Sequence, residues 1–342
     1  MEFKILLIIF FIFFLYVINF LQKKFNFSTD KITKHEKHKL LLSFKKSVPL
    51  SGSFYFIPIT FFLFYNFNIM ACIFCLLFFV LGLLSDLKIT NSPKLRLTIQ
   101  FLLLLIFLYL NDNIIIDTRI EMLNDLMTNN ISRILIIAFF FLVLINGFNF
   151  IDGVNNLCSL NFLIILFFSS LLLYNIDFIT LNNKLFFLIC SLSIFIIYNF
   201  FAKNFLGDGG VYGLGFLIGY ILINLSMLDP RISPYFIANL LWYPSFENLF
   251  SIIRRISNKK KNYLPDNEHF HQLLYLYLNK NFFFKRKYLI SSLTGILINS
   301  YLIIVCFIGY IYYSKTNIQI LLIFSSVLLY LTLYNQLKKK IK

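Results

Sequence analysis

Three aspartates stand where long apolar segments begin or end: Asp86, Asp152 and Asp208. A carboxylate at the edge of a membrane-length apolar run must face protein or water, because an unpaired charge in lipid is costly. Carboxylate oxygens are the protein ligands that Mg²⁺ prefers, together with substrate phosphates. We therefore treat the three aspartates as candidate catalytic residues around Mg²⁺, with Mn²⁺ as the alternative ion.

Amides surround the second aspartate. Asn146, Asn149, Asn155 and Asn156 fall within the stretch 146–156, which directly follows the uncharged run 134–145 and also contains two glycines. Four amides and a carboxylate cannot face lipid, and glycine lets a backbone leave a helix and approach another group closely. This pattern predicts a binding site that opens to a water-filled cleft.

Basic and glycine-rich segments supply groups that could bind a phosphate. Gly207 to Gly210 precede an apolar helix, whose free N–H groups favour an anion. Side chains that could neutralise phosphate charge are Lys45, Lys46, Lys94, Arg96, Lys203, Arg254 and Arg255. Each kind of residue also has a simpler interpretation. An aspartate at a helix end can be a cap, the glycines can form a turn, and the basic side chains can be charges that stop membrane transfer. His269 and His271, two apart on a helix, would point to opposite sides, and no further zinc ligands accompany them.

The elements that must position these residues are membrane helices. Of 342 residues, 59% are hydrophobic and only 13% are charged, which indicates a polytopic all-α membrane protein forming one domain, 1–342. Five cysteines lie in or beside apolar runs and are interpreted as packing residues. We expect eleven spans, at about 3–21, 48–65, 69–84, 97–111, 131–148, 159–175, 184–200, 211–228, 234–251, 289–313 and 317–336.

The positive charge orients these spans. Of the 31 Lys and Arg residues, 25 fall in one alternate set of connecting segments. The positive-inside rule places this set in the cytoplasm, with the N-terminus outside and the C-terminus inside. The net charge of +16 then reflects topology and attraction to the bilayer and argues against nucleic acid. The candidate active-site loops, about 22–47, 85–96, 146–158, 199–210 and 252–288, share the cytoplasmic side. On the outer side, 112–130 could hold a short amphipathic helix.

Five motifs on that side resemble those of the polyprenyl-phosphate N-acetylhexosamine-1-phosphate transferases, glycosyltransferase family 4. They are P-L-S-G-S (49–53), L-L-S-D-L (83–87), N-G-F-N-F-I-D-G (146–153), F-L-G-D-G-G-V-Y-G-L-G (205–215) and H-F-H-Q (269–272). Ser85 stands where the family usually has the first Asp of a pair, and Asn155 and Asn156 replace an Asp and a glycine. These departures favour the O-antigen-initiating branch.

The resemblance implies a Mg²⁺-dependent phosphoglycosyl transferase of the bacterial inner membrane. It would move N-acetylhexosamine-1-phosphate from a UDP-N-acetylhexosamine to undecaprenyl phosphate, releasing UMP, as the first membrane step of a cell-envelope polysaccharide such as lipopolysaccharide. Relatives suggest a homodimer.

The resemblance also assigns roles to residues. Asp208 would be the Mg²⁺ ligand, and Asp86 would position the lipid phosphate or act as its base. The uridine and nearby phosphate would contact Asn146, Asn149, Asp152 and Asn155. The sugar and diphosphate would contact Arg254, Arg255, His269 and His271. With serine in place of the first Asp, we expect position 85 to be dispensable.

Two other classes remain open on the sequence. An ion-coupled transporter would also bury Asp and Asn residues near broken helices, although it predicts mid-membrane polar groups and an internal repeat. A catalytically degenerate family member would explain the motif substitutions.

Overall fold

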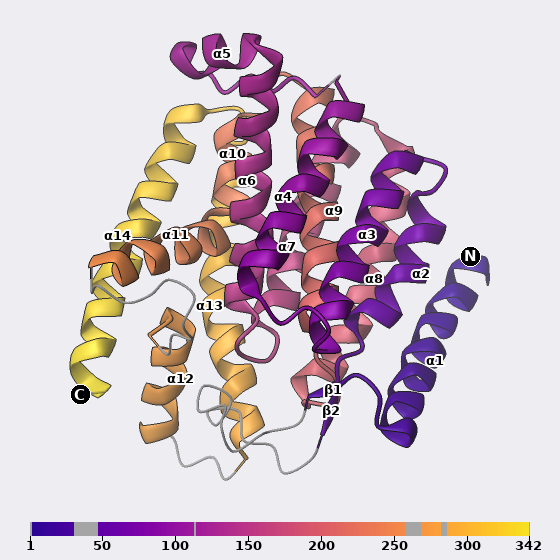
Figure 1. Ribbon diagram of the computed structural model, residues 1–342. Coiled ribbons are helices and arrows are strands. Elements are labelled where there is room, and N and C mark those ends of the chain that lie inside the picture. Colours follow the sequence, from indigo (N-terminus) through magenta and orange to yellow (C-terminus); the bar gives the residue numbers. More distant parts are fainter. Residues whose placement is uncertain (1, 31–46, 113, 258–267, 282–285, 342) are drawn as a thin grey trace.

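The computed structural model describes residues 2–30, 47–112, 114–257, 268–281 and 286–341. Helices dominate it (Figure 1). They are α1 (Glu2–Phe25), α2 (Gly52–Phe64), α3 (Ile69–Asp86), α4 (Pro93–Leu110), α5 (Glu121–Thr128), α6 (Asn130–Ile151), α7 (Leu157–Asn175), α8 (Ile179–Phe200), α9 (Gly207–Leu228), α10 (Pro234–Leu240), α11 (Trp242–Ser257), α12 (Phe270–Asn281), α13 (Lys287–Ile311) and α14 (Thr316–Ile341).

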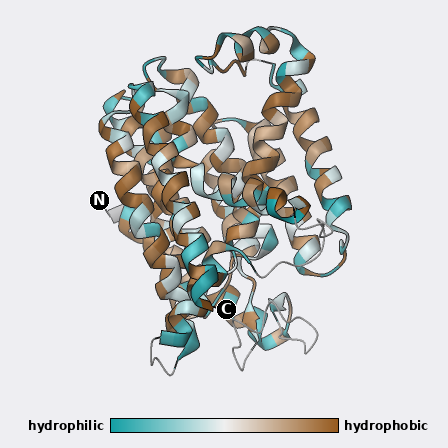
Figure 2. Cartoon of the chain, turned by 90° about the vertical axis from the view of Figure 1, so that its left-hand side faces the viewer, coloured by the Kyte–Doolittle hydropathy of each residue, from teal (hydrophilic) through white to brown (hydrophobic). Residues whose placement is uncertain are grey.

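Nine of these helices are long and apolar enough to cross a membrane, counting only the described residues. They are α1, α3, α4, α6, α7, α8, α9, α13 and α14. Several begin at polar caps that satisfy their first N–H groups. Asn68, for example, accepts from Ala71 N, and Ser92 accepts from Leu95 N ahead of Pro93. The prediction of a polytopic all-helical membrane protein is confirmed, and Figure 2 shows the apolar middle of the bundle between more hydrophilic ends.

Two of the eleven expected spans differ from the prediction. Helix α2 has only 13 residues, because Val48–Pro49 instead forms a strand, β2. The run 234–251 is divided between α10 and α11, and α11 lies across the bundle in Figure 1. Pro244 explains the break, because proline cannot donate to a carbonyl four residues earlier and clashes with it.

Helix α11 is amphipathic in an inverted sense. Its polar residues Glu247, Asn248, Ser251, Arg254 and Arg255 are buried against the protein. Its apolar residues Leu249, Ile252, Ile253 and Ile256 are exposed. In a membrane protein this arrangement turns the apolar face to lipid and the polar face to the site, since lipid is the apolar solvent.

A small backbone ladder joins the start of α2 to the start of α9. Strand β1 (Thr29–Asp30) pairs antiparallel with β2, and Leu50 forms an isolated parallel bridge with Phe205. Phe205 N donates to Pro49 O, and Ser51 N donates to Phe205 O. The P-L-S-G-S motif thus holds the segment that leads into Asp208.

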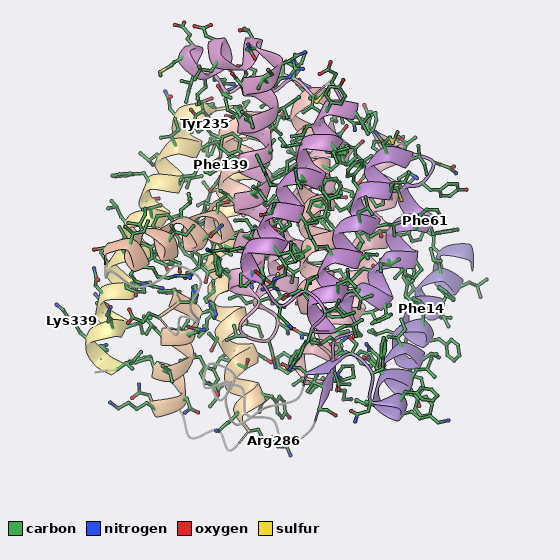
Figure 3. The ribbon with its side chains drawn as sticks, viewed as in Figure 1. Phe14, Phe61, Phe139, Tyr235, Arg286 and Lys339 are labelled. Carbon is green, nitrogen blue, oxygen red and sulfur yellow. The ribbon has the colours of Figure 1, made fainter. Side chains whose placement is uncertain are left out.

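The two ends of the bundle match the two predicted sets of connections. At the upper end in Figure 1, Arg119 donates to Pro230 O, Ser314 O and the Thr316 hydroxyl, so three predicted outer segments lie together. Helix α5 confirms the short helix expected within 112–130. In Figure 3, Arg286 lies at the lower end of the bundle, where Figure 1 places β1 and β2, while Phe14 and Phe61 are on the right-hand flank.

Candidate active site

Helices α3 and α9 form the centre of the site because glycine lets them touch. A Cβ added at Gly82 would lie 2.4 Å from Gly209 N, and one added at Gly209 would lie 2.9 Å from Leu83 N. Any larger side chain would separate the two backbones. This contact places the end of α3, with Ser85 and Asp86, beside the start of α9, with Asp208.

Asp86 caps α9 across this contact. Asp208 N donates to Asp86 Oδ1 at 2.9 Å, and Gly209 N donates to Asp86 Oδ2 at 3.1 Å. Gly207 has φ +70° and lies so close to Asp86 that an added Cβ would be 2.5 Å from Oδ2. The sequence predicted a phosphate at this helix end, with Gly207 binding substrate. The structure places the Asp86 carboxylate there instead, so these amides already bind an anion.

The side chain of Asp208 lies next to a serine and an arginine. Ser85 Oγ donates to Asp208 Oδ2 at 2.6 Å, and Arg96 Nη1 donates to the same oxygen at 2.5 Å. Arg96 also contacts Ser85 Oγ and, at 3.5 Å, the hydroxyl of Tyr212. Ser85, which we expected to be dispensable, therefore contacts the candidate metal ligand directly.

Asp152 completes a group of three carboxylates. It follows the last turn of α6, where its N–H donates to Phe148 O. Burial, then repulsion from Asp208 and Asp86, raises the pKa of the Asp152 carboxyl well above its ordinary value. No hydrogen bond or ion pair of this carboxylate is found within the part of the chain that the structure describes. The charges of all three predicted catalytic residues therefore act on one another.

This arrangement fits Mg²⁺ when a substrate supplies the remaining ligands. In the described ranges, Asp208 uses only Oδ2 in hydrogen bonds, which leaves Oδ1 for a cation, and the Asp152 carboxyl has no hydrogen-bond or ion-pair partner. No group of three or more His, Cys, Asp or Glu side chains among those residues could hold a metal by itself. Mg²⁺ commonly binds proteins through one or two carboxylates plus phosphates.

The predicted amides divide between two directions. Asn146 Nδ2 donates to Gln100 Oε1 at 2.9 Å and to Leu142 O, which ties α6 to α4. Asn149, three residues on and half-buried, lies on the same face of α6. Asn155 is buried and faces α13, where its N–H donates to Ser291 Oγ and its Nδ2 donates to Ser292 Oγ. The structure therefore does not bring Asn155 together with Asn146, and its predicted contact with uridine is not supported.

The two histidines share one side, contrary to the prediction. Helix α12 begins at Phe270, so His269 precedes it and is not bound by helical geometry. The rings of His269 and His271 stack with centroids 5.6 Å apart, and Phe150 stacks on His269 at 5.4 Å. A Cβ on Gly153 would lie 2.3 Å from His271 Nε2, so this glycine admits the ring. The H-F-H-Q motif therefore packs against the stretch 150–153.

Glu247 is a site residue to which the sequence assigned no role. It is fully buried; His269 Nδ1 lies 2.9 Å from Oε1, and the Tyr330 hydroxyl donates to Oε2 at 2.7 Å. Burial raises its pKa, but the hydrogen bond and charge of His269 outweigh that and leave the pKa below its ordinary value. Its spacing of seven and eight residues from Arg254 and Arg255 on one helix was a signal that could have found it.

The predicted arginines are both buried. Arg254 Nη1 donates to Glu268 O at 2.5 Å and to the Tyr334 hydroxyl at 2.9 Å, which joins α11 to α14. Arg255 donates to Ser251 Oγ and lies over the ring of Phe150 at 5.3 Å. Arg255 thus contacts the 146–156 stretch. Lys94 is exposed in the first turn of α4, and Lys45 and Lys46 lie outside the described residues.

The fold and the site define a multi-pass membrane protein with acidic, basic and amide groups gathered at one end. Residues 68–226 match the sequence profile of the family described as glycosyl transferase family 4. It includes α3, α4, α6 and the start of α9, and therefore all three candidate catalytic aspartates.

Curated relatives are bacterial transferases. The chain is 30% identical over 192 residues to a phospho-N-acetylmuramoyl-pentapeptide-transferase of Dictyoglomus thermophilum, covering 53% of this chain and 60% of the relative. A protein of the same description from Dictyoglomus turgidum is 30% identical over 195 residues, covering 53% and 61%. A probable undecaprenyl-phosphate N-acetylglucosaminyl 1-phosphate transferase of Bacillus subtilis is 39% identical over 82 residues, covering 23% of each chain. The chain thus matches about three fifths of the length of the first two relatives.

Proposed function

We propose that this chain transfers N-acetylhexosamine-1-phosphate from a UDP-N-acetylhexosamine to undecaprenyl phosphate. The observation that carries the proposal is the convergence of Asp86, Asp152 and Asp208 from three different helices, inside the segment that matches glycosyl transferase family 4. Acidic groups that repel one another at a membrane end suit a magnesium-bound diphosphate.

In the proposed reaction, an oxygen of undecaprenyl phosphate attacks the β-phosphorus of the donor. The bond between that phosphorus and the bridging oxygen breaks, and UMP leaves with this oxygen. Such transfers depend on alignment and charge neutralisation more than on covalent help from the protein. Mg²⁺ would supply the charge neutralisation at the diphosphate. A phosphate monoester is largely ionised near neutral pH, so the attack does not require Asp86 to act as a base.

The residues of this chain have distinct proposed tasks. Asp208 would hold Mg²⁺ through Oδ1 while Ser85 and Arg96 fix Oδ2. Asp86 would act as a positioning residue, because its carboxylate orients the first turn of α9. Asn149 and Asp152, half-buried at the end of α6, are the groups best placed to contact the donor. Arg255, Phe150 and the histidine pair would border the sugar diphosphate.

An apolar cavity next to α6 supports a lipid acceptor. It has a volume of about 420 Å³ and lies between α5, α6, α9, α10 and α11. Phe139 and Tyr235, which lie near each other in Figure 3, line it. Val143 and Leu144 carry this lining to within one turn of Asn146. A long hydrocarbon chain in this cavity would bring its phosphate toward the carboxylates.

The finer parts of the proposal rest on the sequence. We place the site on the cytoplasmic face of the bacterial inner membrane because 25 of the 31 Lys and Arg residues lie in segments on that side, where nucleotide sugars are made. Ser85 and Asn155 favour the O-antigen branch and thus lipopolysaccharide synthesis. The homodimer stays a prediction.

Membranes that contain the chain provide the test. They would be incubated with Mg²⁺, undecaprenyl phosphate and a panel of β-³²P-labelled UDP-N-acetyl sugars, among them glucosamine, fucosamine and quinovosamine donors. We expect one donor to yield UMP and a labelled lipid in equal amounts. Without lipid phosphate, UMP should not appear. Uptake of donor into vesicles without UMP release would support the transporter, and no reaction with any donor would favour a degenerate family member.

A further inference from the structure

A chain of hydrogen bonds runs from helix α14 through helix α11 to the ring of His269. Helix α11 crosses the bundle and reaches α14 (Figure 1), where the Tyr330 hydroxyl donates to Glu247 Oε2 at 2.7 Å. The other carboxylate oxygen, Oε1, lies 2.9 Å from His269 Nδ1 and accepts from Phe270 N at 3.4 Å. Glu247 is fully buried, so both of its oxygens are used inside the protein.

The backbone and the ring of His269 are both held in place. His269 N donates to Gln272 Oε1 at 3.2 Å, as the residue before a helix does in a capping box. The rings of Phe150 and His271 stack against the imidazole, with centroids 5.4 and 5.6 Å away. Because the Nδ1 edge of the ring faces Glu247, the edge that carries Nε2 faces away from it.

The Nε2 edge of His269 is the one that a ligand can reach. The side chain retains 7% exposure, although the Nδ1 edge lies against a fully buried carboxylate. Nε2 has no hydrogen-bond partner among the described residues, and, unlike either ring nitrogen of His271, it is not enclosed by them. The ring therefore has one anchored nitrogen and one nitrogen that is open to the site.

The carboxylate of Glu247 decides how this ring is protonated. Burial, which raises the pKa of Glu247, is outweighed by the hydrogen bond and charge of His269, so the carboxylate is ionised near neutral pH. An ionised carboxylate only accepts hydrogen bonds, so the proton of the neutral ring must be on Nδ1. When an anion approaches Nε2, that nitrogen takes up a proton from solvent, since the positive ring then lies between two negative groups.

Other charged groups near the ring do not replace Glu247 in this role. His271 is fully buried, and burial, then the charge of His269, lowers its pKa to about 3, so it stays neutral. The carboxylate of Glu268 lies 2.9 Å from Lys338 Nζ. Arg255 lies over the ring of Phe150 and would favour an anion in the same place.

We infer that Glu247 is a positioning residue, which holds His269 so that a protonated Nε2 donates to a phosphate oxygen of the bound sugar nucleotide. This inference rests on the proposed function, in which the histidine pair borders the sugar diphosphate. The ring supplies a positive charge in addition to that of Mg²⁺. Tyr330 supports the carboxylate, so α14, which lies outside the segment that matches the family profile, takes part in the site.

Solid-state ¹⁵N NMR of the full chain in liposomes reads the protonation of each histidine nitrogen. The chain has four histidines, and the signals of His269 are those that a His269→Gln variant loses. The probe is UDP with Mg²⁺, because UDP carries a diphosphate but no sugar to transfer. With UDP bound, we expect Nε2 of His269 to be protonated in the parent and unprotonated in Glu247→Gln, whose amide oxygen can still accept from Nδ1 but carries no charge. An ion pair that only joins α11 to α12 predicts no change of the Nε2 signal when UDP is added, and that result would overturn the inference.

Kinetics of UMP release provide the second readout. Glu247→Gln should lower kcat/KM for the donor about tenfold, because a charge-assisted hydrogen bond to the diphosphate is lost. Tyr330→Phe keeps the carboxylate but removes its support, so it should lower kcat/KM about threefold. This second variant carries the test if Glu247→Gln does not fold. Tyr301→Phe, which removes a different hydrogen bond between α13 and α14, should behave as the parent does.

The two ways in which this account can fail are distinguishable. Parental kinetics in both Glu247→Gln and Tyr330→Phe would overturn the inference and leave the proposed transfer intact. A parent chain that releases no UMP would overturn the proposed function and, with it, the inference.

Discussion

Replacing His271 by glutamine should make the stability of the protein less sensitive to acid. His271 is fully buried, and neither ring nitrogen has a partner within the described part of the chain. Burial, then the charge of His269, lowers its pKa from 6.5 to about 3, against a smaller opposite effect of Glu247. The folded protein therefore holds this ring neutral, while the unfolded chain takes up a proton at the ordinary pKa.

The size of the effect follows from proton linkage. A depressed pKa gives stability that is fully present above the unfolded pKa of 6.5 and lost as pH falls toward about 3. Between about pH 7.5 and about pH 5.5, only the unfolded chain protonates at this position, which lowers the free energy of unfolding by about 1.4 kcal/mol. With the unfolding entropy per residue of globular proteins, this corresponds to a fall in Tm of about 2 °C.

The assay is thermal unfolding in detergent, followed by the fluorescence of the single, buried Trp242. The quantity compared is the change in Tm between the two pH values, so a constant cost of the substitution cancels. The raised pKa of Asp152 acts in the opposite sense, since its folded carboxyl protonates first as pH falls, and it is common to parent and variant. An equal pH dependence of Tm in the parent and in His271→Gln would refute the assignment. Loss of this pH dependence when His35 and His38 are replaced and His271 is kept would also refute it.

Three further changes probe the carboxylate group and its support. Ser85→Ala removes one hydrogen bond to Asp208 and should lower kcat/KM for UMP release about fivefold; unchanged kinetics would mean that position 85 is dispensable after all. Arg96→Gln removes the cation on Asp208 Oδ2, so half-maximal activity should need less Mg²⁺, and a higher requirement would contradict this. Gly82→Ala would place a Cβ 2.4 Å from Gly209 N, a backbone atom of α9, and should cost about 2 kcal/mol of stability or more. Gly215→Ala, with 3.4 Å to its nearest neighbour, should be tolerated, and equal Tm values would count against the close α3–α9 contact.

Most of the fold could be predicted because membrane spans are long apolar runs that are visible in the sequence. Nine of the eleven expected runs are helices of spanning length in the described residues, since lipid admits few other ways to satisfy the backbone. The division of 234–251 was missed because hydropathy does not register a single proline. Pro244 and the buried polar face beginning at Glu247 were visible in the sequence, and together they favour a broken helix.

The sequence predicted which residues form the candidate site better than it predicted the contacts between them. The three aspartates gather as expected, because each ends or begins a span at the same end of the bundle. The direction of a side chain at a helix end depends on one or two backbone angles. His269 precedes its helix and so shares a side with His271, and the left-handed Asn156 follows a turn in which Asn155 faces α13. No periodicity in the sequence encodes these angles.

The capping of α9 shows a second limit. A glycine-rich helix start beside an aspartate is equally consistent with binding a substrate anion or with binding the aspartate itself. Asp86 lies more than a hundred residues before Gly207, so only the packing of α3 on α9 decides between these alternatives.

Release of UMP by membranes that contain Asp208→Asn tests the central claim most directly. The asparagine keeps the size of the side chain and can still accept from Ser85 and Arg96, but it lacks the charge that would hold Mg²⁺ against the diphosphate. With the donor that the parent uses, we expect Mg²⁺-dependent UMP release to fall on the order of a hundredfold or more, with normal expression and Tm. Retention of substantial Mg²⁺-dependent release would contradict the assignment of Asp208 and the proposed site.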